Sequence, residues 1–171
     1  MIIKTRKFTL RPYKKGDEKS LTENINDWNV VRYTCSIAYP YSHKIARVWI
    51  EKNLRLFKTK NKKEINFAID VGGEVIGGIG FKNMDCVKAE IGYWLGKKHW
   101  GKGIMTEAVM LMTDFGLKKL KFRRIYANVM IPNKASIKVL EKNRYRREGR
   151  LKNFYTKDGK LIDVFLYART K

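Results

Sequence analysis

Cysteine and histidine are scarce in this chain, which contains two residues of each. Cys35 and Cys86 lie far apart in the sequence and form no metal-binding or redox motif. The spacing therefore favours two spectator thiols in a reducing cytosol over a disulfide framework or a zinc site. His43 and His99 also lie outside any catalytic pattern. The sequence predicts no metal cofactor.

Long apolar runs are missing as well. No stretch approaches membrane-spanning length, and the first residues, Met-Ile-Ile-Lys-Thr-Arg, lack the hydrophobic region of a signal peptide. We therefore expect a cytoplasmic protein without membrane association. With 171 residues, 44% of them hydrophobic, the chain suits a single domain over residues 1–171 with a packed core.

Acidic residues are few, because 16 Asp and Glu stand against 38 Lys and Arg. The resulting formal net charge of +22 is extreme for this length. It indicates an anionic partner, a polyanionic cofactor or a particular cellular environment, and all three interpretations stay open.

The most informative stretch covers residues 89–116. Residues 91–95 form an uncharged run that is typical of a buried strand, and the glycine-rich residues 96–103 follow. A helix is predicted next, because apolar side chains recur at helical spacing at Ile104, Ala108, Leu111, Met112 and Phe115. The first N–H groups of a helix lack helical partners, and glycines allow an anion to approach them closely. The sequence therefore predicts a phosphate-binding loop.

Two familiar phosphate motifs fail here. Gly96, Gly101 and Lys102 match the nucleotide-binding pattern G-x-x-x-x-G-K-[ST], but Gly103 replaces the hydroxyl residue that would hold magnesium. Loops of that class usually follow an early strand of a parallel sheet, whereas roughly ninety residues of hairpin-like chain precede this one. A dinucleotide fingerprint fails at Thr106, where its third glycine belongs.

A third motif, R/Q-x-x-G-x-G/A, fits residues 98–103 with Lys98 in place of the usual Arg or Gln. This is the pyrophosphate loop of the GNAT superfamily of acyl-CoA N-acyltransferases. Taken alone the match is weak, and a tight strand-to-helix turn is the alternative interpretation.

The rest of the chain alternates between strand and helix patterns. Strands are predicted over residues 3–11, 65–71, 75–81, 123–131, 145–148 and 162–168, with turns at Gly72-Gly73 and Asp158-Gly159. Helices are predicted over residues 17–28, after Ser42 and after Pro132-Asn133. An antiparallel first half and a strand–helix–strand unit in the second half indicate a mixed α/β fold. An aromatic cluster either walls an acceptor pocket or packs helices onto the sheet; it comprises Trp28, Tyr33, Tyr39 and Tyr41.

Segments along most of the chain resemble the RimJ/RimL-type N-acetyltransferases of the GNAT superfamily. They are Leu10-Arg11-Pro12, residues 89–95 (Ala-Glu-Ile-Gly-Tyr-Trp-Leu), residues 100–108 (Trp-Gly-Lys-Gly-Ile-Met-Thr-Glu-Ala), residues 133–142 with their N-x-x-S start, Glu148-Gly149, Asp163 and Tyr167. The resemblance implies a GNAT fold with a largely antiparallel sheet flanked by helices. It also implies transfer of an acetyl group from acetyl-CoA to a primary amine, without a metal. One departure is Arg144, where much of the family has glycine, so either Arg144 or Asn143 is expected to end the helix in a left-handed conformation.

The resemblance also assigns the cofactor contacts. The backbone of Tyr93, Trp94 and Leu95 is expected to pair with the pantetheine arm, and one N–H there to bind the oxyanion. Asn133 is expected to reach the pantetheine. The pyrophosphate is expected to lie against Lys98, His99, Trp100, Gly101, Lys102, Gly103 and Ile104.

The resemblance assigns the acid–base chemistry to two residues. Glu90 resembles a general base that acts through water, although a glutamate at a solvated strand end is an equal alternative. Ser136 resembles the hydroxyl that protonates departing CoA, because Leu140 stands where other members have a tyrosine. A serine that only bonds to the helix backbone is its alternative. Tyr155 lies where RimL-like enzymes place a carboxylate, so the identity of the base stays open.

Three acceptors stay open. The RimL-like features favour a protein N-terminus, and a small-molecule amine is the second interpretation, with polycations disfavoured by the +22 charge. The third is an inactive fold that binds RNA or the ribosome through basic residues, namely Lys118, Lys119, Lys121, Arg123, Arg124, Arg144, Arg146, Arg147 and Arg150. A homodimer is compatible with each of them.

Overall fold

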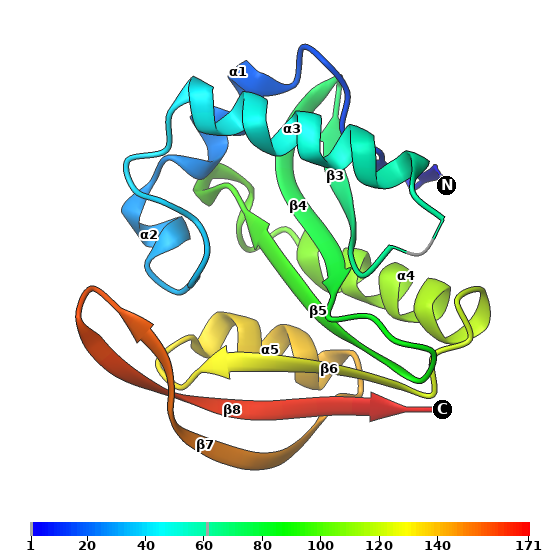
Figure 1. The fold of residues 1–171 in the computed structure, drawn as a ribbon, viewed down its shortest axis with the longest axis vertical. Coiled ribbons are helices and arrows are strands. Elements are labelled where there is room, and N and C mark those ends of the chain that lie inside the picture. The colour runs from blue at the N-terminus through cyan, green and yellow to red at the C-terminus, as the bar shows by residue number, and fades with distance from the viewer. Residues whose placement is uncertain (1, 61) are drawn as a thin grey trace.

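The structure is a computed structural model that describes residues 2–60 and 62–171. In these residues eight strands form one sheet, in the order β1-β2-β3-β4-β5-β6-β8-β7 (Figure 1). The strands are β1 Ile3–Lys4, β2 Thr9–Arg11, β3 Ile65–Val71, β4 Glu74–Lys82, β5 Lys88–Leu95, β6 Arg124–Met130, β7 Arg146–Lys157 and β8 Lys160–Thr170. Neighbouring strands are antiparallel except β5 and β6, which are parallel. The predicted mixed α/β fold is confirmed.

Helices cover both faces of this sheet. They are α1 Glu18–Ile25, α2 Trp28–Val31, α3 His43–Lys58, α4 Ile104–Lys118 and α5 Lys134–Lys142, with a short 3-10 turn at Lys97–His99. Successive side chains of β3 point to opposite faces of the sheet and so belong to two separate parts of the core. Phe67 and Ile69 pack on the side of α4, while Ala68 packs with residues of α1 and α3. The central strands are therefore buried on both faces, and β5, α4 and β6 form the predicted strand–helix–strand unit. None of the described helices has the length and apolarity to cross a membrane.

The structure confirms the predicted helix cap, the predicted turn and the predicted helix end that each depend on one or two residues. Ser42 Oγ accepts a hydrogen bond of 3.3 Å from Ile45 N and caps α3. Gly72 and Gly73 have φ angles of 63° and 94° in the turn between β3 and β4. After α5, Arg144 takes the left-handed conformation with φ of 63°. Of the two predicted alternatives, the one that places Arg144 there is correct.

Three predicted elements differ most from their predicted bounds. The strand over residues 3–11 is split into β1 and β2 by a turn closed by Thr5 N and Phe8 O at 2.9 Å. The helix over residues 17–28 ends at Ile25, because Asp27 caps α2 as a separate turn by accepting from Asn29 N at 2.7 Å. β7 has 12 residues rather than the short strand at 145–148. Most of β7 is exposed at the sheet edge, so its sequence lacks clear apolar alternation.

Candidate active site

The parallel strands β5 and β6 diverge after three residue pairs. Lys88, Ala89 and Glu90 pair with residues 124–126, and beyond them β5 continues beside β4 while β6 continues beside β8. Figure 1 shows the two strands diverging toward the end of β5. Backbone groups of residues 91–95 that face β6 therefore have no strand partner within residues 2–60 and 62–171. An extended ligand can pair with such an open edge in the manner of an added strand.

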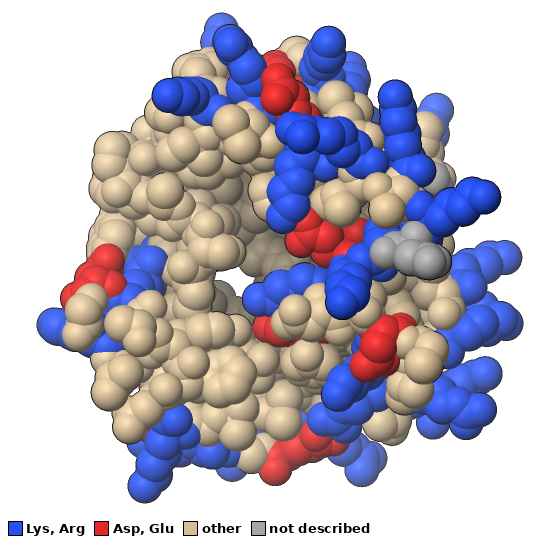
Figure 2. Space-filling model, viewed as in Figure 1, with Lys and Arg blue, Asp and Glu red and all other residues tan. Residues whose placement is uncertain are grey.

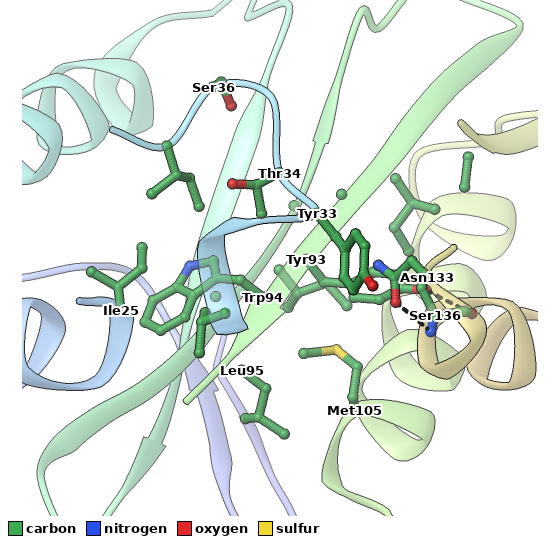
Figure 3. A pocket seen from close by; sticks show the side chains of 18 of the residues that line it. Ile25, Tyr33, Thr34, Ser36, Tyr93, Trp94, Leu95, Met105, Asn133 and Ser136 are labelled. Carbon is green, nitrogen blue, oxygen red and sulfur yellow. Dashed lines mark hydrogen bonds between the residues drawn. The ribbon is translucent and has the colours of Figure 1, made fainter. Parts of the chain in front are cut away.

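A cavity of about 1280 Å³ occupies this opening. Figure 2 shows the hollow, bordered largely by uncharged side chains, and Figure 3 shows part of its wall. It brings together most of the residues predicted for the site, namely Glu90, Tyr93, Trp94, Leu95, His99, Trp100, Gly101, Gly103, Ile104, Asn133 and Ser136. Lys98 and Lys102 are exposed and do not line it. Residues from distant segments also line the cavity, including Tyr33, Cys35, Trp49 and Asn128.

The glycine loop has the geometry of an anion site. Gly101 and Gly103 have φ angles of 76° and 74°, which residues other than glycine rarely adopt. An added Cβ on Gly101 would meet nothing within 4 Å. Trp100 Nε1 donates to Leu95 O at 2.7 Å and holds the loop against the end of β5. The first helical bond of α4 runs from Glu107 N to Gly103 O at 3.1 Å, so the N–H groups of residues 104–106 lack helical partners.

A cation that no motif predicts lies at this loop. Lys7 Nζ lies 3.4 Å from Lys102 O and 4.0 Å from Glu107 Oε2. It also lies 3.5 Å from the position of a Cβ built on Gly103. The turn between β1 and β2 brings it there across 95 residues of sequence. Lys7 therefore adds positive charge to the N-terminus of α4, where the helix dipole already favours an anion.

The start of α5 presents a hydroxyl to the cavity. Asn133 Oδ1 accepts from Ser136 N at 3.1 Å and caps the helix. Ser136 Oγ lies 2.8 Å from the hydroxyl oxygen of Tyr93, so it pairs with a side chain rather than with the helix backbone. Figure 3 shows these three residues gathered at one end of the cavity. Burial raises the pKa of Tyr93, so this phenol stays protonated at neutral pH.

Glu90 is buried, with 5% exposure, so its interpretation as a solvated residue is wrong. Its carboxylate accepts from Asn83 Nδ2 at 2.9 Å, and Lys82 Nζ lies 3.2 Å away. The hydroxyl of Tyr155 donates to Glu90 Oε1 at 3.4 Å. Burial, together with the charge of Glu90, raises the pKa of Tyr155. Tyr155 is therefore a poor base, and the carboxylate is the stronger candidate.

Glu90, Gly92 and Trp94 lie on one face of β5 and line the floor of the cavity, which is its part away from the glycine loop. An added Cβ on Gly92 would meet nothing within 4 Å, so the floor is open beside the carboxylate. Asn128 Oδ1 is buried without a hydrogen-bond partner among the described residues. Of the predicted aromatic cluster, Tyr33 and Tyr41 line the cavity. Trp28 and Tyr39 lie outside it and contact each other with ring planes tilted by 60° and ring centroids 5.5 Å apart.

Comparison with known proteins identifies the class to which this fold and site belong. Residues 7–146 match the family model described as Acetyltransferase (GNAT) domain. The uncharacterized N-acetyltransferase p20 of Bacillus licheniformis is 33% identical over 169 residues, which cover 98% of this chain and 94% of that protein. The ribosomal-protein-serine acetyltransferase of Escherichia coli (strain K12) is 33% identical over 105 residues, which cover 60% of this chain and 59% of that protein.

A solved structure agrees with this result. RimL, a ribosomal L7/L12 alpha-N-protein acetyltransferase in complex with coenzyme A, superposes with a TM-score of 0.84 at 25% identity, covering 99% of this chain and 98% of that one. The fold and site therefore define an acyltransferase that uses acetyl-CoA and acts on an amine. This chain belongs to the GNAT acetyltransferase family.

Proposed function

We propose that this acetyltransferase modifies the α-amine at the N-terminus of a protein, with Glu90 as the base and Ser136 as the acid. The observation that carries the acceptor assignment is the wide cavity beside Glu90, whose floor is open at Gly92. Such a space accommodates an amine together with the first side chain of a peptide. The names of the E. coli relative and of RimL, both acetyltransferases of ribosomal proteins, support the same class of acceptor.

The polar atoms beside Gly92 suit an amine nucleophile. Glu90 supplies a buried carboxylate, and the unpartnered Asn128 Oδ1 is a second acceptor oxygen on the same cavity. An attacking amine needs acceptors for its N–H groups and a base for the proton that it loses. Glu90 takes that proton directly or through one water molecule, while Asn128 orients the nitrogen.

The opposite part of the cavity suits acetyl-CoA. The open edge at Tyr93, Trp94 and Leu95 pairs with the pantetheine arm, and an N–H of that edge stabilises the oxyanion. The N–H groups of residues 101–104 and the ammonium of Lys7 hold the pyrophosphate, whereas His99 N and Trp100 N already donate to Gly96 O and Lys97 O. Asn133 contacts the pantetheine, and Ser136 protonates the sulfur as the thioester breaks.

The net charge of +22 favours a substrate that belongs to a negatively charged complex. Figure 2 shows Lys and Arg side chains gathered on the side of the molecule where Figure 1 places the end of α4 and both termini. The hollow itself is bordered mainly by uncharged atoms. We infer that the cationic side draws the enzyme to an acidic or RNA-containing partner such as a ribosomal complex, and that the cavity selects the amine.

A substrate panel tests this proposal. Thiol release from acetyl-CoA is measured with peptides that differ in their first residue, with the same peptides carrying a blocked N-terminus and an internal lysine, and with small amines. We expect turnover with free N-termini only, and mass spectrometry should place the acetyl group on the α-nitrogen. Turnover with small amines alone, or with the blocked peptides equally well, would contradict the proposed acceptor.

A further inference from the structure

Two hydroxyl groups from distant parts of the chain form a pair in the cavity wall. The hydroxyl oxygen of Tyr93 on β5 lies 2.8 Å from Ser136 Oγ on α5, and it lies 3.4 Å from Ser136 O. Figure 3 shows the Tyr93 side chain reaching from β5 toward the first turn of α5. Both residues line the cavity where β5 and β6 diverge. The pair therefore lies between the open strand edge and the cap of α5.

Either hydroxyl of this pair could donate at a separation of 2.8 Å. Burial raises the pKa of Tyr93, so the phenol keeps its single proton at neutral pH. Ser136 Oγ lies nearer to the phenol oxygen than Ser136 O does, so we assign Tyr93 as the donor to Ser136 Oγ. When Tyr93 donates to Ser136 Oγ, the serine must direct its own proton elsewhere, and the cavity is the side that stays open. A hydroxyl that accepts a hydrogen bond is also the better proton donor, because its oxygen is stabilised as it loses the proton.

We propose that Tyr93 is a positioning residue for the acid step, whose hydroxyl aims the Ser136 proton at the sulfur of the departing CoA. The inference rests on the acid role proposed for Ser136. The C–N bond forms first, and the proton that the amine loses goes to Glu90. The resulting oxyanion then collapses and the C–S bond breaks, its electron pair leaving on sulfur, which takes the Ser136 proton. Tyr93 keeps its own proton and stabilises the Ser136 oxygen. The proton that Glu90 took from the amine then passes through water to the Ser136 oxygen, so both residues return to their starting states.

A double-mutant cycle tests the inference. Tyr93→Phe removes one oxygen atom and should lower kcat about tenfold, the effect of one functional hydrogen bond, while KM for acetyl-CoA stays within about twofold. Ser136→Ala should lower kcat by a larger factor. In the Ser136→Ala background, Tyr93→Phe should have no further effect, because Tyr93 acts only through the serine hydroxyl. In Ser136→Thr, which keeps a hydroxyl, Tyr93→Phe should again lower kcat.

The fold offers a matched control. The hydroxyl of Tyr145 lies 2.8 Å from Thr113 Oγ1, and both residues are buried and lie outside the cavity lining. Tyr145→Phe therefore removes an equivalent hydrogen bond from the core. We expect it to lower Tm at least as much as Tyr93→Phe and to leave kcat within about twofold of the wild type.

Several outcomes would overturn the inference. A normal kcat for Tyr93→Phe alongside a slow Ser136→Ala variant would remove Tyr93 from the acid step and leave the role of Ser136 intact. Losses that multiply in the double variant would show that Tyr93 acts through packing. A fully active Ser136→Ala variant would remove the proposed acid, and the role of Tyr93 with it. The cycle can be measured with any accepted amine, so a wrong acceptor assignment leaves its result interpretable.

Discussion

The guanidinium of Arg11 donates hydrogen bonds of 2.8 Å to both carboxylate oxygens of Asp17, whose side chain is 1% exposed. Arg11 Nε also donates to Asp70 Oδ2 at 2.8 Å. One side chain of β2 therefore connects the N-terminus of α1 to β3. The segment Leu10-Arg11-Pro12, which carries part of the family resemblance, has a structural reason for its arginine.

Replacing Arg11 should destabilise the protein strongly. Arg11→Leu leaves the buried Asp17 carboxylate without its charged partner, with the hydrogen bond from Lys14 N remaining, and we expect the free energy of unfolding to fall by about 3–5 kcal/mol. The control is Arg55→Leu, since Arg55 pairs with Glu51 on the surface of α3, with side-chain exposures of 79% and 51%. That change should cost less than about 1 kcal/mol. Urea denaturation measures both values, and equal losses would contradict the assigned role.

The loop glycines should be required for cofactor affinity. Gly101→Val or Gly103→Val forces a branched side chain into left-handed backbone and places it where the pyrophosphate is expected, so acetyl-CoA binding should weaken at least about tenfold. Gly159→Val is a matched control, because Gly159 has φ of 73° and equally open surroundings in the turn between β7 and β8. It should lower Tm and keep the affinity measured by calorimetry. Normal binding by both loop variants would place the phosphate cradle elsewhere.

Lys7 should contribute to the same affinity through its charge. Lys7→Ala removes the ammonium beside Gly103, and we expect the Kd of acetyl-CoA to rise about three- to tenfold at low salt and less at high salt. Lys4→Ala removes an exposed lysine of β1 and serves as the control of equal charge. If the two variants bind acetyl-CoA equally well, Lys7 does not contact the phosphates.

Acetyl-CoA should bind without a metal. Gly103 occupies the position where a nucleotide-binding loop needs a magnesium ligand, so we expect acetyl-CoA to raise Tm equally with and without EDTA. Mg-ATP should raise Tm far less. A rise with ATP that depends on Mg²⁺ and exceeds the rise with acetyl-CoA would contradict this assignment of the loop.

The role of Glu90 should appear in the pH dependence of the rate. A base matters most when the amine is protonated, so Glu90→Gln should lose about a hundredfold in rate at neutral pH and recover partly toward an α-amine pKa of about 8. Glu148→Gln is the control, because Glu148 lies on the exposed edge strand β7 and its carboxylate pairs with Arg124 of β6. A Glu90→Gln rate that equals the wild type at every pH would exclude Glu90 as the base.

The sequence by itself determined those features that depend on neighbouring residues. Gly72 and Gly73 fixed the hairpin, and Asn133 fixed the start of α5, since turns and caps form over a few residues. The glycines of the loop predicted the turn before α4 for the same reason, and the anion site at that turn stays a prediction. The apolar repeat along α4 predicted that helix, because its buried face recurs at the helical period. β7 was predicted too short, since an exposed edge strand has no such period.

Only the tertiary structure decided the features that join distant segments. The sequence named Glu90 and left its burial open, because Asn83 and Tyr155 reach it only in the folded sheet. Lys7 meets the loop across 95 residues, and Tyr93 meets Ser136 across 43. Such contacts depend on how whole strands and helices pack, and the spacing of residues in the chain carries no record of them. The cavity itself exists because β5 and β6 part after Glu90, each held by its own antiparallel neighbour.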